Sequence, residues 1–173
     1  MQQLVDLIKK NDRKAQEQLY KQYANKMFLT CIRYVNNEDD AAEILNTGFY
    51  KAFSAIHSFQ FINQIAFDSW LRKIMINESL MFLRKKNKNI SFSDIEQTMT
   101  TDFSISENHM LNEDYYVLIQ KLPVGYRTVF NLFAIEGYNH SEIAEMLDIS
   151  ESTSRSQLSR AREMLQKLIK KEL

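Results

Sequence analysis

The segment NHSEIAEMLDISESTSRSQLSRAREML (residues 139–165) decides the fold of this chain. Asn139 followed three residues later by Glu142 is the pattern of a capping box, in which each side chain bonds the other residue's backbone at a helix start. Three apolar residues then fall on one face of that helix: Ile143, Ala144 and Leu147. Residues 147–149 predict a tight turn, and Ser150 can cap a second helix.

The second helix is predicted to run from residue 151 to about residue 170, with Leu158 and Leu165 facing inward. Its outer face carries Arg155, Ser156, Ser159, Arg160 and Arg162. A short helix that braces a second one of this kind is a helix-turn-helix, whose second helix enters the major groove of DNA. Arginine can bond two acceptors of one guanine, and serine can bond phosphates. The alternative is a helical hairpin whose basic residues are simply solvated.

The composition fits an all-helical fold. The 173 residues include only three glycines and one proline, and they suffice for one medium domain or two small ones. Hydrophobic residues make up 45% and charged residues 25%, as in an ordinary globular protein. The net charge of zero excludes a uniformly basic nucleic-acid binder but leaves room for local basic patches.

Several functional classes find no support in the sequence. Cys31 is the only cysteine, so no disulfide framework exists, and the three histidines lack metal-ligand spacing. We find no nucleophile–base set, phosphate loop or metal cluster, so no enzyme activity, cofactor, metal or small-molecule substrate is predicted. The sequence shows no signal peptide and no stretch of transmembrane length, so we expect a cytoplasmic protein without direct membrane insertion.

Periodicity divides the chain into two helical domains, residues 1–88 and 113–173, joined by a polar, net acidic linker at 89–112. In the first domain, helices are predicted from about residue 19 to 35, from 41 to 56 and from 68 to 85, with an aromatic-rich loop at 57–66. The third helix is expected to turn Trp70, Leu71, Ile74, Met75 and Met81 inward. Pro123 and Gly125 interrupt the helices of the second domain, and Gly137 fits a C-terminal cap.

The third helix also carries a face suited to single-stranded DNA. Trp70, Asn77 and Arg84 are seven residues apart, so they share one side, and Lys73 lies one turn along. An aromatic ring stacks on bases, an amide can bond a base edge and cations hold phosphates. Two alternatives stay open, namely that Trp70 belongs to the core and that the basic cluster at 84–88 is a solvated helix end.

Three blocks of sequence resemble a known family. LPVGYRTVFNLFAIEGYNHSEIAEMLDISESTSRSQLSRAREML is similar to region 4 of bacterial RNA polymerase sigma factors. LYKQYANKMFLTCIRYVNNEDDAAEILNTGFYKAF resembles the core-binding helices of region 2, and FDSWLRKIMINESLMFLRKKNK resembles the part of region 2 that opens the promoter. Two such domains with a short linker resemble the extracytoplasmic-function (ECF) group.

The resemblance implies three sets of contacts. The −35 element would be recognised by Arg155, Ser156, Ser159 and Arg160, with Arg162 near the DNA backbone. One strand of the −10 element, with a base flipped out, would be bound by Phe61, Phe67, Trp70, Lys73 and Asn77, with phosphate contacts from Arg84, Lys85 and Lys86. The clamp helices of the polymerase's largest subunit would meet Asp40, Glu43, Asn46, Thr47 and Tyr50. Phe67 could instead simply plug the loop.

The resemblance also implies partners, namely core RNA polymerase through its clamp helices and beta flap, promoter DNA and an anti-sigma factor. The chain departs from the family pattern at several positions. Asn46 is a shorter amide than the usual glutamine, a charge is lost at Thr47, and Gly48 costs helix stability of about 1 kcal/mol. Ser154 replaces a valine, so we expect its hydroxyl to bond back to its own helix. Gln157 replaces a frequent arginine, which is expected to remove a phosphate contact.

Two further classes compete with a sigma factor. A stand-alone helix-turn-helix regulator would need a receiver domain, a ligand domain or a dimerisation helix, and the first half of the chain offers none. That reading also leaves the Trp70 and Asn77 face unexplained. An enzyme would need a catalytic constellation, which the sequence lacks.

Overall fold

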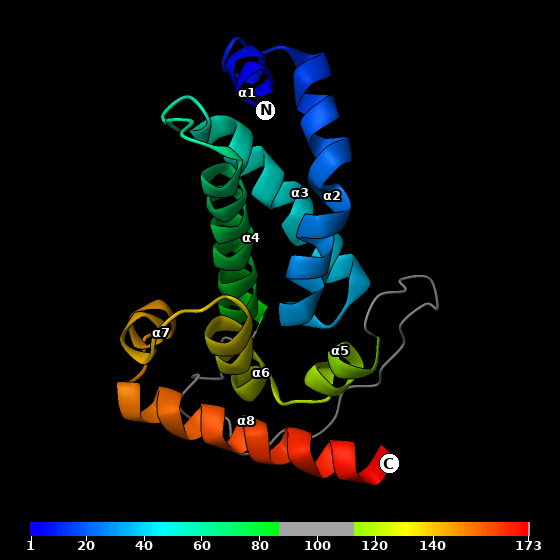
Figure 1. Cartoon of the computed structure of the whole chain (residues 1–173), viewed down its shortest axis with the longest axis vertical. Helices are drawn as coiled ribbons and strands as arrows, with labels where there is room; N and C mark the ends of the chain where they lie inside the picture. The colour runs from blue at the N-terminus through cyan, green and yellow to red at the C-terminus, as the bar shows by residue number, and fades with distance from the viewer. Residues whose placement is uncertain (87–112, 173) are drawn as a thin grey trace. The chain divides into compact units, whose positions relative to one another are not determined.

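The computed structural model describes residues 1–86 and 113–172, which form helices and no strand (Figure 1). In chain order these are α1 (Gln2–Lys9), α2 (Arg13–Val35), α3 (Glu38–Ala55), α4 (Gln64–Lys86), α5 (Glu113–Gln120), α6 (Val124–Phe130), the π-helix η1 (Asn131–Ile135), α7 (His140–Leu147) and α8 (Glu151–Glu172). The predicted all-helical class is confirmed. The chain divides into two compact units, Met1–Leu83 and Arg84–Leu173, and the predicted linker at 89–112 lies outside the described residues.

Side-chain caps set the helix boundaries of the first unit. Asp12 accepts a hydrogen bond from the backbone of Ala15 at 3.0 Å, so α2 begins six residues before the predicted start. Asn36 ends α2 in the left-handed region, with φ of 56°, and Asn37 caps α3 through the Asp40 amide at 2.9 Å. The predicted break between the two helices is therefore confirmed. Helix α1 was not predicted, because its eight residues are too few for a clear periodic signal.

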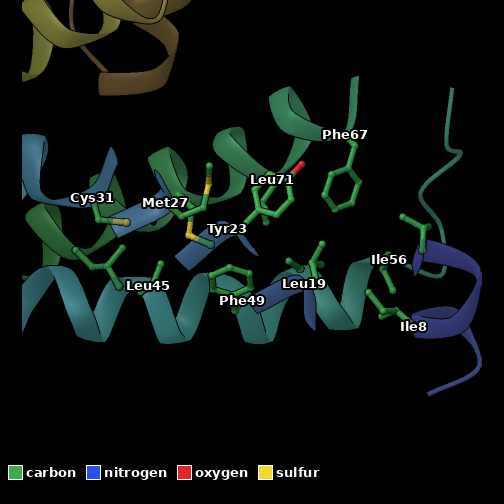
Figure 2. Close-up of a cluster of buried hydrophobic side chains, with 14 of the residues drawn as sticks. Ile8, Leu19, Tyr23, Met27, Cys31, Leu45, Phe49, Ile56, Phe67 and Leu71 are labelled. Carbon is green, nitrogen blue, oxygen red and sulfur yellow. The ribbon is translucent and has the colours of Figure 1, made fainter. Parts of the chain in front are cut away.

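One hydrophobic core holds the four helices of the first unit together. Figure 2 shows side chains from all of them meeting in one layer: Ile8, Leu19, Tyr23, Met27, Cys31, Leu45, Phe49, Ile56, Phe67 and Leu71. Each of these is at most 6% exposed. Burying a side chain of this size contributes about 1.5–3 kcal/mol, so the core provides the main stabilisation of the unit. Burial of the Cys31 thiol also raises its pKa to about 12, as befits an inert core cysteine.

Gly48 has a packing role that its helix propensity does not suggest. A Cβ atom built at Gly48 would overlap the sulfur atom of Met75, which is fully buried on α4. The missing side chain therefore lets Met75 pack directly against the backbone of α3. The predicted cost to helix stability is the counterpart of this close approach.

Two polar anchors tie α4 to its neighbours. The Tyr23 hydroxyl donates to Asp68 at 2.5 Å, and Lys26 forms an ion pair with the same carboxylate at 2.8 Å. Further along, the Lys51 ammonium lies 2.6 Å from Glu78, which is only 8% exposed. Because a buried carboxylate needs a partner, the Lys51 contact accounts for an acidic residue inside the unit.

In the second unit, a buried arginine closes the end of α5. Arg127 is 5% exposed and donates to the carbonyl oxygens of Gln120 and Leu122 at 3.2 and 3.0 Å. Burial lowers the pKa of its guanidinium to about 10. These bonds satisfy the carbonyl of Gln120, the last residue of α5, and that of Leu122 in the turn that follows. Helix α6 then continues into η1, and Gly137, with φ of 81°, ends this segment as predicted.

Candidate nucleic-acid and polymerase interfaces

The local geometry of the helix-turn-helix agrees with the sequence pattern. Asn139 accepts a hydrogen bond from the Glu142 amide at 2.9 Å, and the Glu142 carboxylate accepts one from the Asn139 amide at 2.8 Å. Asp148, with φ of 56°, ends α7. Ser150 then accepts a bond from the Thr153 amide at 3.0 Å and caps α8. The predicted capping box, turn and cap are all confirmed.

The five predicted side chains of α8 are exposed and share one face, which we call the α8 face: Arg155, Ser156, Ser159, Arg160 and Arg162. Several of them have partners within the chain. Arg155 forms an ion pair with Glu151 at 2.7 Å, and Ser159 lies 3.4 Å from Glu163. The Arg160 guanidinium donates to the Tyr126 hydroxyl at 3.4 Å. The α8 face is therefore a row of donors and cations that is accessible to a polyanion.

The structure corrects two expectations about the interior side of α8. Ser154 is fully buried, but its hydroxyl lies 2.9 Å from Nδ1 of His140 on α7 and does not bond back to its own helix. Gln157 is only 4% exposed. A side chain at position 157 therefore points into the unit, so its identity does not decide a phosphate contact.

Sequence reasoning missed the side chains that surround His140. The His140 ring stacks on Phe133 of η1, with centroids 4.7 Å apart and an angle of 24° between the planes. The Arg162 guanidinium carbon lies 5.7 Å from the centre of the Phe133 ring. Burial, followed by the nearby charge of Arg155, lowers the pKa of His140. No sequence periodicity indicates this cluster, because a π-helix carries Phe133 out of the α-helical register.

Part of the predicted face on α4 is accessible. Lys73 and Asn77 are exposed, as are the three basic residues at 84–86. The exposure of Asn77 agrees with its predicted place on the accessible side of this helix. Trp70 is half-buried and stacks on Phe59, with ring centroids 4.6 Å apart. Its ring therefore belongs partly to the core and partly to the surface, between the two alternatives.

Phe67 is a correction. Its side chain is 0% exposed and packs edge-on against Tyr23 at 5.7 Å between ring centroids, so it is part of the core and cannot stack on a base in this arrangement. Helix α4 begins at Gln64, four residues before the predicted start, and Asn63 accepts a bond from the Ala66 amide at 2.8 Å. This earlier start places Phe67 inside the helix, on its inner face. Phe61, in the preceding loop, is half-buried.

Another expectation on α4 is wrong. Met81 was expected to face inward, but it is 51% exposed, beside the Lys51 ammonium, which lies 3.9 Å from its sulfur. Along α4, the inner face instead passes through Leu80 and Leu83. Met81 follows the buried Met75 by six residues, so it lies about 120° around the helix from that side chain and off the inner face.

The predicted polymerase contacts lie on α3. Glu43, Asn46, Thr47 and Tyr50 are exposed, Tyr50 at 74%, whereas Asp40 is half-buried. Ile44 and Phe49 are each 2% exposed on the opposite side. We call this exposed set, with Asp40 at its edge, the α3 face. Within residues 1–86 and 113–172, no helix is long and apolar enough to span a membrane.

Comparison with known families identifies the class of protein. The model "Sigma-70 region 2" matches residues 19–89, and the model "Sigma-70, region 4" matches residues 112–165. These matches span most of α2, all of α3 and α4, and the helix-turn-helix as far as residue 165 of α8. The chain is therefore a sigma factor of the sigma-70 type. Such proteins are transcription initiation factors that bind core RNA polymerase and direct it to promoters, and a stand-alone regulator is not favoured.

Curated relatives define the group within that class. The ECF RNA polymerase sigma-E factor of Haemophilus influenzae is 32% identical over 97% of this chain and 94% of that protein. The sigma-E factor of Escherichia coli K12 is 30% identical, over 95% and 91%. The chain belongs to the ECF sigma factor family. It directs promoter-specific initiation of transcription as a subunit of RNA polymerase.

Solved structures show the same fold. The structure of CnrH in complex with the cytosolic domain of CnrY matches with a TM-score of 0.52 and 19% identity, over 98% of this chain and 97% of that chain. The sigma factor RpoE of Bartonella quintana, solved with the anti-sigma factor NepR, matches with a TM-score of 0.55 and 22% identity, over 89% and 96%.

Proposed function

We propose that the α8 face binds the −35 element of the promoter in the major groove. The observation that carries this assignment is that all five predicted side chains are exposed on one face of a helix whose start is fixed by a capped turn. Arg155 precedes Ser159 by four residues, and Ser156 precedes Arg160 by four, so each pair is adjacent along the exposed side of the helix. Arginines so placed can bond guanine edges or phosphates.

The test is transcription by core RNA polymerase reconstituted with the full chain, on a promoter mapped by start-site analysis. Arg155→Ala and Arg160→Ala should each reduce promoter-specific transcripts about tenfold, because one good base contact contributes about 1–3 kcal/mol. Lys167→Ala is the matched control, since Lys167 is an exposed cation further along α8. Unchanged transcript levels in both arginine variants would exclude the α8 face as the −35 contact.

Helix α4 and the loop before it supply the second promoter contact in this proposal. Trp70, Lys73 and Asn77, with Phe61 and the basic residues at 84–86, bind the single-stranded −10 element. Trp70 offers a partly exposed ring for stacking, and Asn77 offers an exposed amide for a base edge. Phe67 contributes to this site only by packing, since its buried ring contacts the Trp70 ring, with 5.5 Å between the ring centroids. Asn77→Ala should reduce transcription from duplex promoters more than from templates that are already open at −10.

The α3 face is our candidate for the clamp-helix contact, and the second unit for the beta flap. Tyr50, the aromatic residue of the α3 face, is 74% exposed, and exposed aromatic side chains often contribute most to binding a partner protein. Tyr50→Ala should weaken co-purification with core polymerase, whereas the exposed His57→Ala, just beyond α3, should not. Retention of full polymerase binding by Tyr50→Ala would exclude this anchor.

An anti-sigma factor is a further proposed partner. The similar structure of CnrH holds the cytosolic domain of CnrY, and that of the Bartonella quintana sigma factor RpoE holds the anti-sigma factor NepR. We propose that this chain is regulated in the same manner, works in the cytoplasm and carries out no reaction of its own. Purification of the native protein from cells, followed by identification of what co-elutes in the absence of polymerase, tests the anti-sigma partner.

A further inference from the structure

His140 joins three elements of the second unit. It begins α7, its Nδ1 atom lies 2.9 Å from the Ser154 hydroxyl of α8, and its ring stacks on Phe133 of η1. The third member of the cluster is Arg162, whose guanidinium carbon lies 5.7 Å from the centre of the Phe133 ring. One side chain thus connects both helices of the helix-turn-helix with the ring that lies under an exposed cation.

The bond to Ser154 is not a surface contact. Ser154 is 0% exposed, so its hydroxyl is out of reach of solvent and of DNA. A buried hydroxyl without a partner is costly, and His140 provides the partner. Because Ser154 immediately precedes Arg155, this bond also fixes the start of α8 relative to α7.

The stack on Phe133 restricts the ring that Arg162 covers. An exposed arginine has many rotamers, and an aromatic platform selects those that keep the guanidinium over the ring. If the platform moves, Arg162 loses this preference. His140 therefore affects Arg162 through Phe133 without touching it.

We propose that His140 is a positioning residue for DNA binding, which holds Phe133 in place as the platform that directs Arg162 toward a DNA phosphate. This inference rests on the proposed function, in which Arg162 lies near the DNA backbone. His140 itself makes no DNA contact in this arrangement. The pair His140 and Ser154 replaces the purely apolar contact that a valine at position 154 would make.

The salt dependence of DNA binding separates positioning from a merely structural role. The full chain is titrated onto a duplex that carries the mapped −35 element, and affinity is measured against salt concentration at pH 8, where His140 is neutral. Each phosphate contact contributes about 0.9 to the slope of log affinity against log salt. Arg162→Ala should make this slope less steep by about 0.9, and His140→Ala should do so by a similar amount. The double variant should make it no shallower than either single variant does. Ser141→Ala, an exposed neutral neighbour, should leave the slope unchanged.

The outcomes are distinct. A slope that does not change in Arg162→Ala overturns the proposed phosphate contact itself. A slope that falls in Arg162→Ala but not in His140→Ala, or that falls further in the double variant, overturns the positioning role. If His140→Ala unfolds, the pair His140→Phe with Ser154→Val keeps a ring on Phe133 and removes the buried hydroxyl. That pair should restore the wild-type slope, and failure to do so in a folded protein also overturns the inference.

Discussion

Gly48→Ala should destabilise the wild-type protein but stabilise a variant in which Met75 has been replaced by alanine. In the wild-type protein the new methyl group overlaps the sulfur of a fully buried Met75, and overpacking of this kind costs about 1–3 kcal/mol. Alanine gains only about 1 kcal/mol over glycine in helix propensity. We therefore expect Gly48→Ala to lower the free energy of unfolding by up to about 2 kcal/mol.

In the background of Met75→Ala the overlap is gone, so only the helix propensity remains. Met75→Ala alone should cost about 2–5 kcal/mol, and Gly48→Ala should then restore about 1 kcal/mol of it. The coupling between the two positions should thus be about 1–3 kcal/mol. Thr47→Ala is the control, because Thr47 is exposed on the same helix and its effect should be the same in both backgrounds.

Urea denaturation followed by tryptophan fluorescence measures these effects in the right unit. Trp70 is the only tryptophan of the chain, and it stacks on Phe59 and Phe67 in the first unit. Its emission therefore reports the unfolding of the unit that contains Gly48. A stabilisation of about 1 kcal/mol by Gly48→Ala in the wild-type background, with no coupling to Met75, would refute the cost assigned to the overlap with the Met75 side chain.

Three further predictions follow from buried or partly buried charges. Arg127→Met should destabilise the second unit by about 2–4 kcal/mol in thermal or urea unfolding, because it leaves carbonyl oxygens without donors, whereas an exposed Lys121→Met should have little effect. Although burial raises it, the pKa of Asp68 is lowered overall by hydrogen bonds from Lys26, Tyr23 and Gln64, so the carboxylate stabilises the folded state above its unfolded pKa of about 3.9. Asp68→Asn should therefore have a lower free energy of unfolding at pH 7 than the wild type. Below pH 4 its free energy of unfolding should depend less steeply on pH, and a dependence identical to that of the wild type would contradict this. The pKa of His140, which faces Arg155, Arg162 and Glu151, is lowered in the folded protein. Just below pH 6.5 the unfolded state therefore binds more protons than the folded state, so the second unit should lose stability as the pH falls through this range. His140→Gln should make this loss of stability with falling pH smaller.

Periodicity and capping patterns predicted much of the fold, because these signals depend on local sequence. The pair Asn139 and Glu142 specifies a helix start within four residues, and the structure contains the predicted box. The short helix α1 gave no such signal, and its place in the core depends on tertiary contacts of Val5 and Ile8. Sequence patterns also could not place Phe67, because a start of α4 at Gln64 moves that ring from the loop into the helix.

In the candidate sites, too, the features that depend on local sequence were predictable and those that depend on tertiary contacts were not. Exposure of the α8 face and of most of the α3 face follows from helical spacing alone, so the sequence predicted it. The partners of buried polar groups do not follow from spacing, since Ser154 could bond its own helix or a neighbouring one with equal local geometry. Only the position of α7 against α8 selects His140. The interior of a polar cluster is therefore the part of a site that requires a structure.

The contacts within the α8 face bear on how it can bind DNA. The Arg155 ion pair with Glu151 is exposed at both ends, with side chains 60% and 44% accessible, and such pairs contribute at most about 1 kcal/mol. Arg160 has a long bond to Tyr126, and Ser159 a long bond to Glu163. None of these contacts is strong enough to prevent these side chains from leaving their partners and bonding a DNA phosphate or base instead. They do keep the side chains extended over the helix surface in the free protein, so binding orders them less than it would order solvated side chains. By contrast, the buried contacts of Ser154 and Arg127 would be costly to break, so the framework beneath the face stays fixed while the donors on it exchange partners.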